Sequence, residues 1–442
     1  MRGAWDTRSS LRLFRLFQHR LVKDSLVLLG VQITGYLLPL ITLPYLTRVL
    51  GPSSFGLLTL GSALVLYFYV ITEYGFAVTG TRRVAIVQED ISKVSAVYSA
   101  IMACKLGLLV LCFLTLCGLL VWIPKLHQYW QLYLVSFLQV LGWCLSPTWL
   151  LQGMQRMRFI AYSDYGAKIV LVAMIFVLVH KPSDYLRAAA LQSGGFVISA
   201  LIGMVLVFGV LKIRLVWPPF EEMKTAMIAG LPVFFSMASL TAISSTNTMI
   251  LGMVAQPDQV GFLGAGMRLI TAARALTNPI TTAVYPHMSR VAARSRSEGI
   301  RMMQKQLLWT AAPFLLITLV LAFFSPLVVQ ILYRKAYAET GVLLRIMCLT
   351  PFVHAVSMCF GTYYMLAFGY EKEWSKIVTR MLILNFITLF LLMLVMRPVR
   401  AVAATTTIMD IYSATASYLF YRRTAKAAKT TRPVNAVELT PK

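Results

Sequence analysis

Long hydrophilic stretches and acidic residues are scarce in this sequence. Only 13% of its 442 residues are charged, and 16 Asp and Glu stand against 41 Lys and Arg. A soluble protein carries about 25% charged residues, so a chain with 58% hydrophobic residues reads as a polytopic membrane protein. A net charge of +25 can indicate nucleic-acid binding, but no hydrophilic stretch is long enough to form the soluble domain that this function needs. We therefore expect no nucleic-acid partner.

Motifs for catalysis and energy conversion are also missing. The chain has no G-x-x-x-x-G-K-[ST] phosphate loop, which excludes a self-contained ATPase, and no catalytic triad or metal-ligand spacing. Its six cysteines lie in apolar segments without a CxxC pair or a histidine cluster, so we interpret them as buried apolar residues. We expect no enzyme activity, no cofactor and no bound metal.

What the sequence has instead is apolar runs of membrane-spanning length. With about 20 apolar residues needed for each crossing, it predicts an all-α integral membrane protein of about twelve transmembrane helices. They lie at about residues 25–47, 55–78, 96–123, 130–151, 160–180, 184–211, 225–251, 259–284, 307–333, 340–367, 374–396 and 400–421. Lys and Arg gather at both termini and in the loops after the even-numbered helices, so the positive-inside rule places both termini in the cytoplasm.

Three pairs of similar stretches indicate an internal repeat. FGLLTLGSAL at Phe55–Leu64 is echoed by VGFLGAGMRL at Val260–Leu269, and TGTRRVA ending at Ala85 is echoed by YPHMSRVA ending at Ala292. The turns after the fourth and tenth helices form the third pair. Two parallel six-helix lobes related by a pseudo-two-fold axis along the membrane normal are therefore predicted, with a central substrate cavity near the midplane.

The predicted domains follow from this division. Residues 1–24 form a basic amphipathic segment that suits a helix lying in the cytoplasmic interface, although an incidental basic leader fits them as well. The lobes span 25–211 and 225–421, and a cytoplasmic linker joins them at 212–224. Residues 422–442 form a basic cytoplasmic tail that we expect to be disordered.

Four stretches carry a family resemblance. They are LLPLITLPYLTRVLGPSSFGLLTLGSAL at Leu37–Leu64, EYGFAVTGTRRVAIVQED at Glu73–Asp90, WLLQGMQRM at Trp149–Met157 and VYPHMSRVAARS at Val284–Ser295. They resemble the signature stretches of bacterial polysaccharide transporters, the O-antigen and exopolysaccharide repeat-unit flippases of the multidrug/oligosaccharidyl-lipid/polysaccharide superfamily. The resemblance implies an inner-membrane protein that moves an undecaprenyl-diphosphate-linked oligosaccharide from the cytoplasmic to the periplasmic leaflet by alternating access. It also implies contact with membrane lipids and with the polysaccharide polymerisation machinery.

Basic residues inside the apolar runs are the candidate ligands for such a substrate. A cation in hydrocarbon is costly unless it faces protein or water, and arginine suits a diphosphate because its planar fork donates two parallel hydrogen bonds. The seven residues of this kind are Lys105, Lys168, Arg187, Arg268, Arg274, Arg345 and Arg380.

The predicted helix at 259–284 holds the clearest case. Its small and polar residues fall within about 40° of one helical line, so we expect a stripe that faces the cavity. The stripe consists of Gly264, Arg268, Thr271, Ala275, Asn278 and Thr282. Arg268 lies roughly 13 Å below the periplasmic end of this predicted helix, at a rise of 1.5 Å per residue. Arg274, about 120° round the helix, either captures phosphate or contacts a neighbouring carboxylate.

The remaining cations have weaker claims. Near helix ends a long stem carries the charge to the interface, and this applies to Arg187, Arg345 and Arg380. Lys168 lies four residues after Asp164, so we expect these two to pair. Lys105 is a further candidate for the substrate site.

Two carboxylates inside predicted helices bear on energy coupling. Asp410, near the midplane, either takes up H⁺ or Na⁺ during transport or is the permanent partner of an arginine in its own lobe. Glu73 either guards the cytoplasmic entrance or pairs with Arg82 or Arg83. We interpret His354, alone on an apolar helix, as a core residue rather than a proton relay.

Two other functions compete with the flippase. A drug/cation antiporter of the same superfamily would favour acidic and aromatic cavity residues, whereas the residues inferred here are net basic. An integral-membrane glycosyltransferase or ligase would need a long periplasmic loop with paired carboxylates or arginines, and the sequence predicts only short ones.

Overall fold

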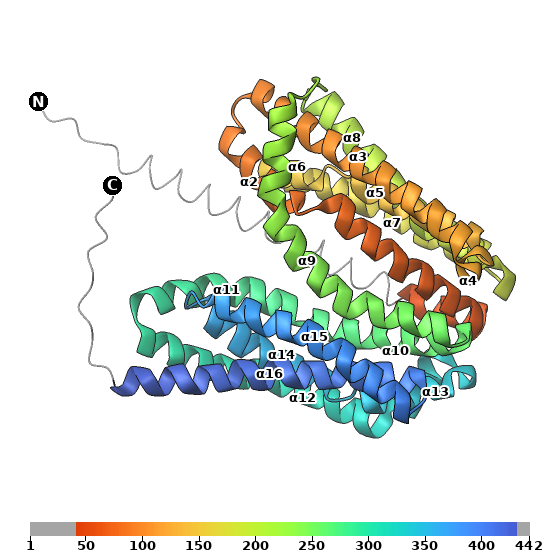
Figure 1. Cartoon of the computed structure of the whole chain (residues 1–442), viewed down its shortest axis with the longest axis vertical. Coiled ribbons are helices and arrows are strands. Elements are labelled where there is room, and N and C mark those ends of the chain that lie inside the picture. The colour runs from red at the N-terminus through yellow and green to blue at the C-terminus, as the bar shows by residue number, and fades with distance from the viewer. Residues whose placement is uncertain (1–40, 431–442) are drawn as a thin grey trace, which may run out of the picture. The chain divides into compact units, whose positions relative to one another are not determined.

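The computed structural model describes residues 41–430 of the chain. Most of these residues are helical, and no strand occurs among them (Figure 1). Eight helical stretches of these residues are long and apolar enough to cross a membrane. The prediction of an all-α multi-pass membrane protein is therefore confirmed, while the count of twelve helices stays a prediction. The segment 1–24 and most of the first predicted helix lie outside the described residues.

The eight stretches correspond to most of the predicted helices. They are Ile41–Val87, Ile91–Trp122, Trp130–Gly153, Pro182–Val210, Phe220–Ile243, Arg296–Tyr333, Lys335–Leu366 and Glu371–Val395. Four further helices account for the remaining predicted ones. They are α7 (Met157–Leu178), α10 (Pro257–Ala275), α11 (Thr277–Arg294) and α16 (Pro398–Thr430). The last three carry the candidate site, whose polar residues lower their hydropathy.

The chain divides into two compact units, one ending at Ala265 and the other beginning at Gly266. In the first unit the helical stretch 41–73 precedes a series of helices. They are α2 (Phe76–Val87), α3 (Ile91–Trp122), α4 (Pro124–His127), α5 (Trp130–Leu145), α6 (Thr148–Gly153), α7, α8 (Tyr185–Val205) and α9 (Phe220–Val254). Here α8 packs against α5 and α7, α2 against α6, and α9 against α2 and α3.

Capping and small residues explain parts of this arrangement. Asp90 caps α3, because its Oδ1 accepts from the backbone N–H groups of Ser92 at 3.0 Å and Lys93 at 3.2 Å. The backbone N–H of Lys93, then its side chain and the N–H of Ser92, hold the pKa of this carboxyl below its usual value. Where α5 meets α8, a Cβ on Gly142 would come within 2.5 Å of the backbone of Phe196, so glycine permits the close approach.

The second unit contains the last helices of the chain. They are α11, α12 (Arg296–Tyr333), α13 (Ala338–Ile346), α14 (Thr350–Met358), the π-helical turn η4 (Cys359–Leu366), α15 (Glu371–Val395) and α16. In this unit α14 contacts both α12 and α16, α15 packs against α16, and α11 packs against α12. The end of α10 also belongs to this unit, and a Cβ on Gly266 would lie 3.2 Å from Met347.

The expectation of a disordered tail from Arg422 onward is wrong for its first nine residues, because α16 continues to Thr430. Ala, Lys and Arg dominate this stretch and favour helix. The helix is also anchored, since the Thr424 and Tyr364 hydroxyls are 2.7 Å apart. Residues 431–442 lie outside the described part of the chain.

The first pair of repeated stretches makes a reciprocal contact within the first unit. Gly56 and Gly261 occupy the same place in the two echoes, and Pro52 and Pro257 each precede them by four residues. A Cβ on Gly56 would collide with the carbonyl of Pro257, and a Cβ on Gly261 would collide with that of Pro52. One turn further on, a Cβ on Gly264 would lie 2.5 Å from Oγ1 of its counterpart, Thr59. The repeat found in the sequence is thus also a direct backbone contact.

This contact predicts opposite outcomes for two glycine substitutions. Gly56→Ala should destabilise the protein by about 1–3 kcal/mol, because the added methyl group forces two backbones apart. Gly118→Ala, inside α3 where a Cβ meets nothing within 4 Å, should be neutral or stabilise by up to roughly 1 kcal/mol. Thermal denaturation of the purified variants in detergent measures both. Equal stability of the two variants would contradict the reciprocal contact.

Candidate functional site

Two of the residues predicted for the site meet each other in the first unit. Lys105, within α3, places its Nζ 2.9 Å from Oε2 of Glu73. Their side chains are only 1% and 7% exposed. The same Nζ lies 3.5 Å from the carbonyl oxygen of Trp143, to which it donates. The two opposite charges therefore lie buried between helices of the first unit as a hydrogen-bonded pair.

A turn after the helical stretch 41–73 determines the position of Glu73. Tyr74 and Gly75 both adopt left-handed backbone angles, with φ of 47° and 83°, and α2 starts at Phe76. The Tyr74 ring stacks on Phe234 of α9 at 4.9 Å. Glu73 thus has Lys105 as its partner, and the alternative pairing with Arg82 or Arg83 is wrong. The roles of Lys105 in substrate binding and of Glu73 in gating stay predictions.

An aromatic series extends from this pair towards Lys168. Tyr69 packs on Trp143 at 4.5 Å between ring centroids, and Trp143 packs on Phe196 at 5.0 Å. Lys168 places Nζ 5.1 Å from the centre of the Phe196 ring, close enough for a cation–π interaction. The side chain of Asp164 lies outside the described residues, so its pairing with Lys168 stays a prediction.

The second unit holds the other pair among the predicted residues. Arg274, in the last turn of α10, donates from Nη2 to Oδ2 of Asp410, which lies within α16. Both side chains keep some accessible surface, 24% and 17% respectively. This contact is the structural alternative that the sequence left open for both residues. Phosphate capture by Arg274 and ion coupling by Asp410 stay proposals.

Two residues of α14 complete this polar cluster. Thr350 lies beside the Asp410 carboxylate, and His354 interacts electrostatically with Arg274. Sequence reasoning treated His354 as an isolated core residue and did not consider Thr350. Their spacing of four residues, which places both on one helical face, is the signal that would have identified them as a unit.

The polar stripe predicted for one helix is divided between two. The expectation of a continuous helix at 259–284 is wrong, because α10 ends at Ala275 and α11 begins at Thr277. Pro279 has no N–H to donate to the carbonyl of Ala275, and its ring crowds that carbonyl, which explains the break at Leu276. Arg268 and Thr271 consequently lie on α10, whereas Asn278 and Thr282 lie on α11.

Four residues of the stripe are nevertheless exposed, namely Arg268, Thr271, Asn278 and Thr282. Ala275 and Gly264 are buried, so they do not contribute accessible surface. Within residues 41–430, Arg268 forms no ion pair, and its electrostatic neighbour is the phenol of Tyr333. Of the two arginines on α10, Arg268 is therefore the one available to an anion without breaking an existing contact.

The cations near helix ends lie as expected at accessible positions. Arg345 and Arg380 are exposed, and Arg187 is 66% exposed while it pairs with Asp184 at 3.1 Å. An ion pair that the sequence did not suggest joins α16 to α13. Arg400 donates from Nε at 3.0 Å and from Nη2 at 2.9 Å to Oε1 of Glu339.

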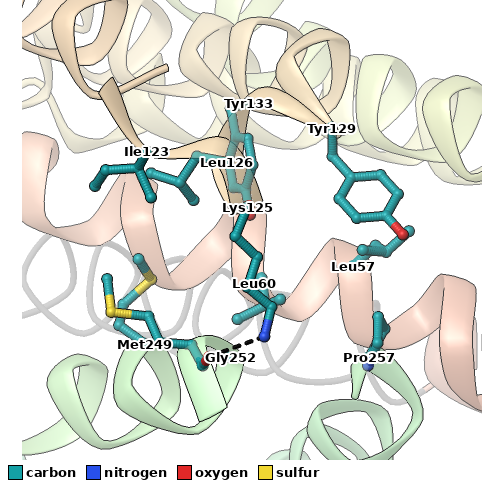
Figure 2. A pocket seen from close by; sticks show the side chains of 11 residues that line it. Leu57, Leu60, Ile123, Lys125, Leu126, Tyr129, Tyr133, Met249, Gly252 and Pro257 are labelled. Atoms are coloured by element: carbon teal, nitrogen blue, oxygen red, sulfur yellow. Dashed lines mark hydrogen bonds between the residues drawn. The ribbon is translucent and has the colours of Figure 1, made fainter. Parts of the chain in front are cut away.

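A pocket in the first unit, shown in Figure 2, contains none of the predicted site residues. Its lining is mostly apolar, with Leu57, Leu60 and Met249 among the contributors. Its lysine, Lys125, is already engaged, because Nζ donates to the carbonyl of Met253 at 2.9 Å. This pocket lacks the free cations that a diphosphate needs, so it is not the candidate site.

The buried Glu73–Lys105 pair predicts a strong dependence of each residue on the other. Lys105→Met should destabilise the protein by about 3–5 kcal/mol, because it leaves a buried carboxylate without its partner. Adding Glu73→Gln removes the orphan charge and should restore most of the loss. Thermal unfolding in detergent of the wild type, both single variants and the double variant completes a double-mutant cycle. Additive effects of the two substitutions would contradict direct pairing.

Comparison with known proteins agrees with the fold and the sequence motifs. A multidrug resistance MATE family transporter of the MOP superfamily, solved in an inward-facing conformation, shares the fold with a TM-score of 0.73 at 15% identity, covering 92% of this chain and 99% of that one. The "Putative O-antigen transporter" of Escherichia coli (strain K12) is 28% identical over 83% of this chain and 89% of its own length. The protein of the same name from Shigella dysenteriae is 28% identical over 80% and 88%.

A family assignment follows from the sequence profile. The profile of the family described as "Polysaccharide biosynthesis protein" matches residues 21–292, more than half of the chain. The matched region includes the reciprocal glycine contact, the Glu73–Lys105 pair and the stripe on α10 and α11. The chain belongs to the polysaccharide biosynthesis protein family.

Proposed function

We propose that this protein is a flippase that moves an undecaprenyl-diphosphate-linked oligosaccharide from the cytoplasmic to the periplasmic leaflet, for O-antigen, capsule or exopolysaccharide synthesis. Family membership and the names of the two relatives support this proposal. The observation that carries it is the exposed Arg268, which lies on a helix within the apolar part of the chain and has no ion-pair partner in residues 41–430. Such a cation needs an anion or water.

The proposed substrate contacts follow from exposure. Arg268 binds one phosphate, and the Thr271 hydroxyl on the same helix supplies a further hydrogen bond. Asn278, beyond the break at Leu276, has an amide that suits phosphate or sugar hydroxyl groups. Arg274 meets the diphosphate later, once its contact with Asp410 opens. Lys105 and Glu73 act as one neutral unit whose opening would expose a further cation during gating.

Alternating access is the transport mechanism that fits a binding site on interrupted helices. Asp410 is the carboxylate that would exchange H⁺ or Na⁺ during the cycle. The fold shared with a multidrug transporter makes a drug/cation antiporter the second candidate. The exposed residue of the stripe that carries charge is an arginine, which favours an anionic substrate over a cationic drug. The residues of the site hold no nucleophile with an adjacent base, which favours transport over glycosyl transfer.

The proposed location is the bacterial inner membrane with both termini in the cytoplasm. The distribution of Lys and Arg supports this orientation. The proposed partners are membrane lipids and, on the periplasmic side, the machinery that polymerises the translocated repeat units.

Replacement of Arg268 tests the central claim. Arg268→Ala should reduce surface polysaccharide about tenfold or more in a strain lacking its own flippase, since loss of a charged hydrogen bond costs roughly 1.5–3 kcal/mol, and Arg268→Glu should abolish it. The matched control is Arg380→Ala, which removes another exposed arginine of an apolar helix and should leave display unchanged. Immunoblots of the membrane fraction establish equal protein levels. Undiminished display by both Arg268 variants would rule out the phosphate role.

Replacement of Asp410 tests ion coupling. Asp410→Asn cannot ionise, so its transport should lose the dependence on external pH or Na⁺ that we expect of the wild type. The charged and titratable groups near this carboxylate are Arg274 and, beyond it, His354. His354→Gln therefore serves as the control and should keep the dependence. Uptake into proteoliposomes at several pH values and Na⁺ concentrations provides the measurement, and an unaltered profile for Asp410→Asn removes this residue from coupling.

A further inference from the structure

We propose that Asp410 is an internal competitor of the substrate, in that its carboxylate occupies on Arg274 the place that one phosphate of the lipid-linked diphosphate takes. The proposal rests on the proposed function and specifies how the same site releases and accepts its anion. It is carried by the incomplete hydrogen bonding of the Arg274–Asp410 pair and by the contrast with another ion pair that involves α16.

The Arg274 guanidinium is only partly used by Asp410. Nη2 donates to Oδ2, while Nε is buried and has no hydrogen-bond partner in the described part of the chain. A guanidinium is able to donate two parallel hydrogen bonds to one anion. The pair therefore leaves a buried donor unsatisfied, at a cost that a larger acceptor would remove.

Arg400 and Glu339 show what a complete contact looks like in the same unit. There, Nε and Nη2 both donate to Oε1 of the carboxylate, at 3.0 and 2.9 Å. Both pairs connect α16 to another helix of the unit, one through an Asp and the other through a Glu. The Arg400–Glu339 pair uses both Nε and Nη2, as a structural link does. In the Arg274–Asp410 pair, Nε of the arginine remains unused.

Thr350 is a further neighbour of the carboxylate. Its hydroxyl interacts with Asp410, and its side chain has no exposed surface. The orphan donor of this cluster is therefore the buried Nε of Arg274. A phosphate group presents three strong acceptor oxygens, so it is able to accept from Nε as well as from Nη2.

The exchange has a consequence for charge. The Arg274–Asp410 pair is neutral, so an arriving phosphate that takes Arg274 leaves Asp410 without its counter-charge. An uncompensated carboxylate in this environment is costly, so it must bind a cation or be exposed to water before the exchange is complete. Arrival of the anion at Arg274 and neutralisation of Asp410 are consequently linked steps. The partial exposure of both side chains, 24% and 17%, gives the anion and the cation access.

Binding of a short polyprenyl diphosphate to the purified full-length protein tests the exchange. The probe is radiolabelled farnesyl diphosphate, which carries the diphosphate and an isoprenoid chain but no sugar. Asp410→Asn should bind it about tenfold more tightly than the wild type, the equivalent of roughly 1.4 kcal/mol. Asp410→Glu keeps a competing carboxylate and should show no such gain. The Arg400–Glu339 pair supplies the control. Glu339→Gln removes a carboxylate from that pair and should bind the probe like the wild type.

A double variant separates competition from a general loosening of the fold. In Arg274→Gln/Asp410→Asn the gain should disappear, because the arginine freed by the Asn substitution is no longer present. Asp410→Ser provides a second neutral variant in case Asp410→Asn is not monodisperse by size-exclusion chromatography. If Asp410→Asn and Asp410→Ser bind no better than the wild type while Arg268→Ala weakens binding, the competition is refuted and the proposed function stands. If the wild type does not bind the probe and Arg268→Ala leaves surface polysaccharide undiminished, the proposed function itself fails. The competition then fails with it.

Discussion

Charge compensation in a low-dielectric interior is the constraint on which the rest of this structure depends. An ionised side chain within an apolar helix needs an opposite charge, a polar neighbour or water, and the described residues provide a different solution in each case. Lys105 and Glu73 are almost completely buried and satisfy each other. Arg274 and Asp410 are paired but remain partly accessible. Arg268 is exposed, with a phenol as its neighbour. In this order, the three cases run from charges that satisfy each other to a charge that is accessible to a ligand.

The break between α10 and α11 lies within the candidate site. A continuous helix would carry Arg268, Thr271 and Asn278 along one line. Pro279 interrupts this helix at Leu276, although the backbone angles of Leu276 stay helical, with φ of −63° and ψ of −16°. Arg274 lies in the last turn before the interruption. The arginine for which we propose an exchange of partners is thus close to a point where the helix lacks a backbone hydrogen bond.

The sequence was sufficient for the properties that depend on composition and periodicity. Apolar runs predicted the helices, and the echo of Phe55–Leu64 in Val260–Leu269 indicated a repeat, whereas the contact between these stretches became visible only in the structure. The partners of charged residues depend instead on packing between distant segments. Glu73 and Lys105 are on different helices, and nothing in their spacing relates them. The same holds for Arg274 and Asp410, for which the sequence indicated only that each needed a partner.

The errors in local structure have specific physical causes. The helix break at Leu276 was overlooked because the apolar pattern continues through it, although Pro279 was visible in the sequence. The first residues of the tail were expected to be disordered from their composition, whereas Thr424 joins Tyr364 and the helix continues. The helices of the candidate site, α10, α11 and α16, are less apolar than the membrane-spanning stretches, so hydropathy is a weak guide to these helices.

The reciprocal contact of Gly56 and Gly261 has the form of a self-complementary interface. Each glycine approaches the backbone near the proline that precedes the other, as corresponding residues do across the two-fold axis of a homodimer. In a dimer of identical chains, one substitution at this point would appear twice and act on both sides at once. Within a single chain the two positions can change independently, so one half can relax the close approach while the other retains it. A single chain therefore permits an asymmetry at this crossing that two separate identical chains could not have.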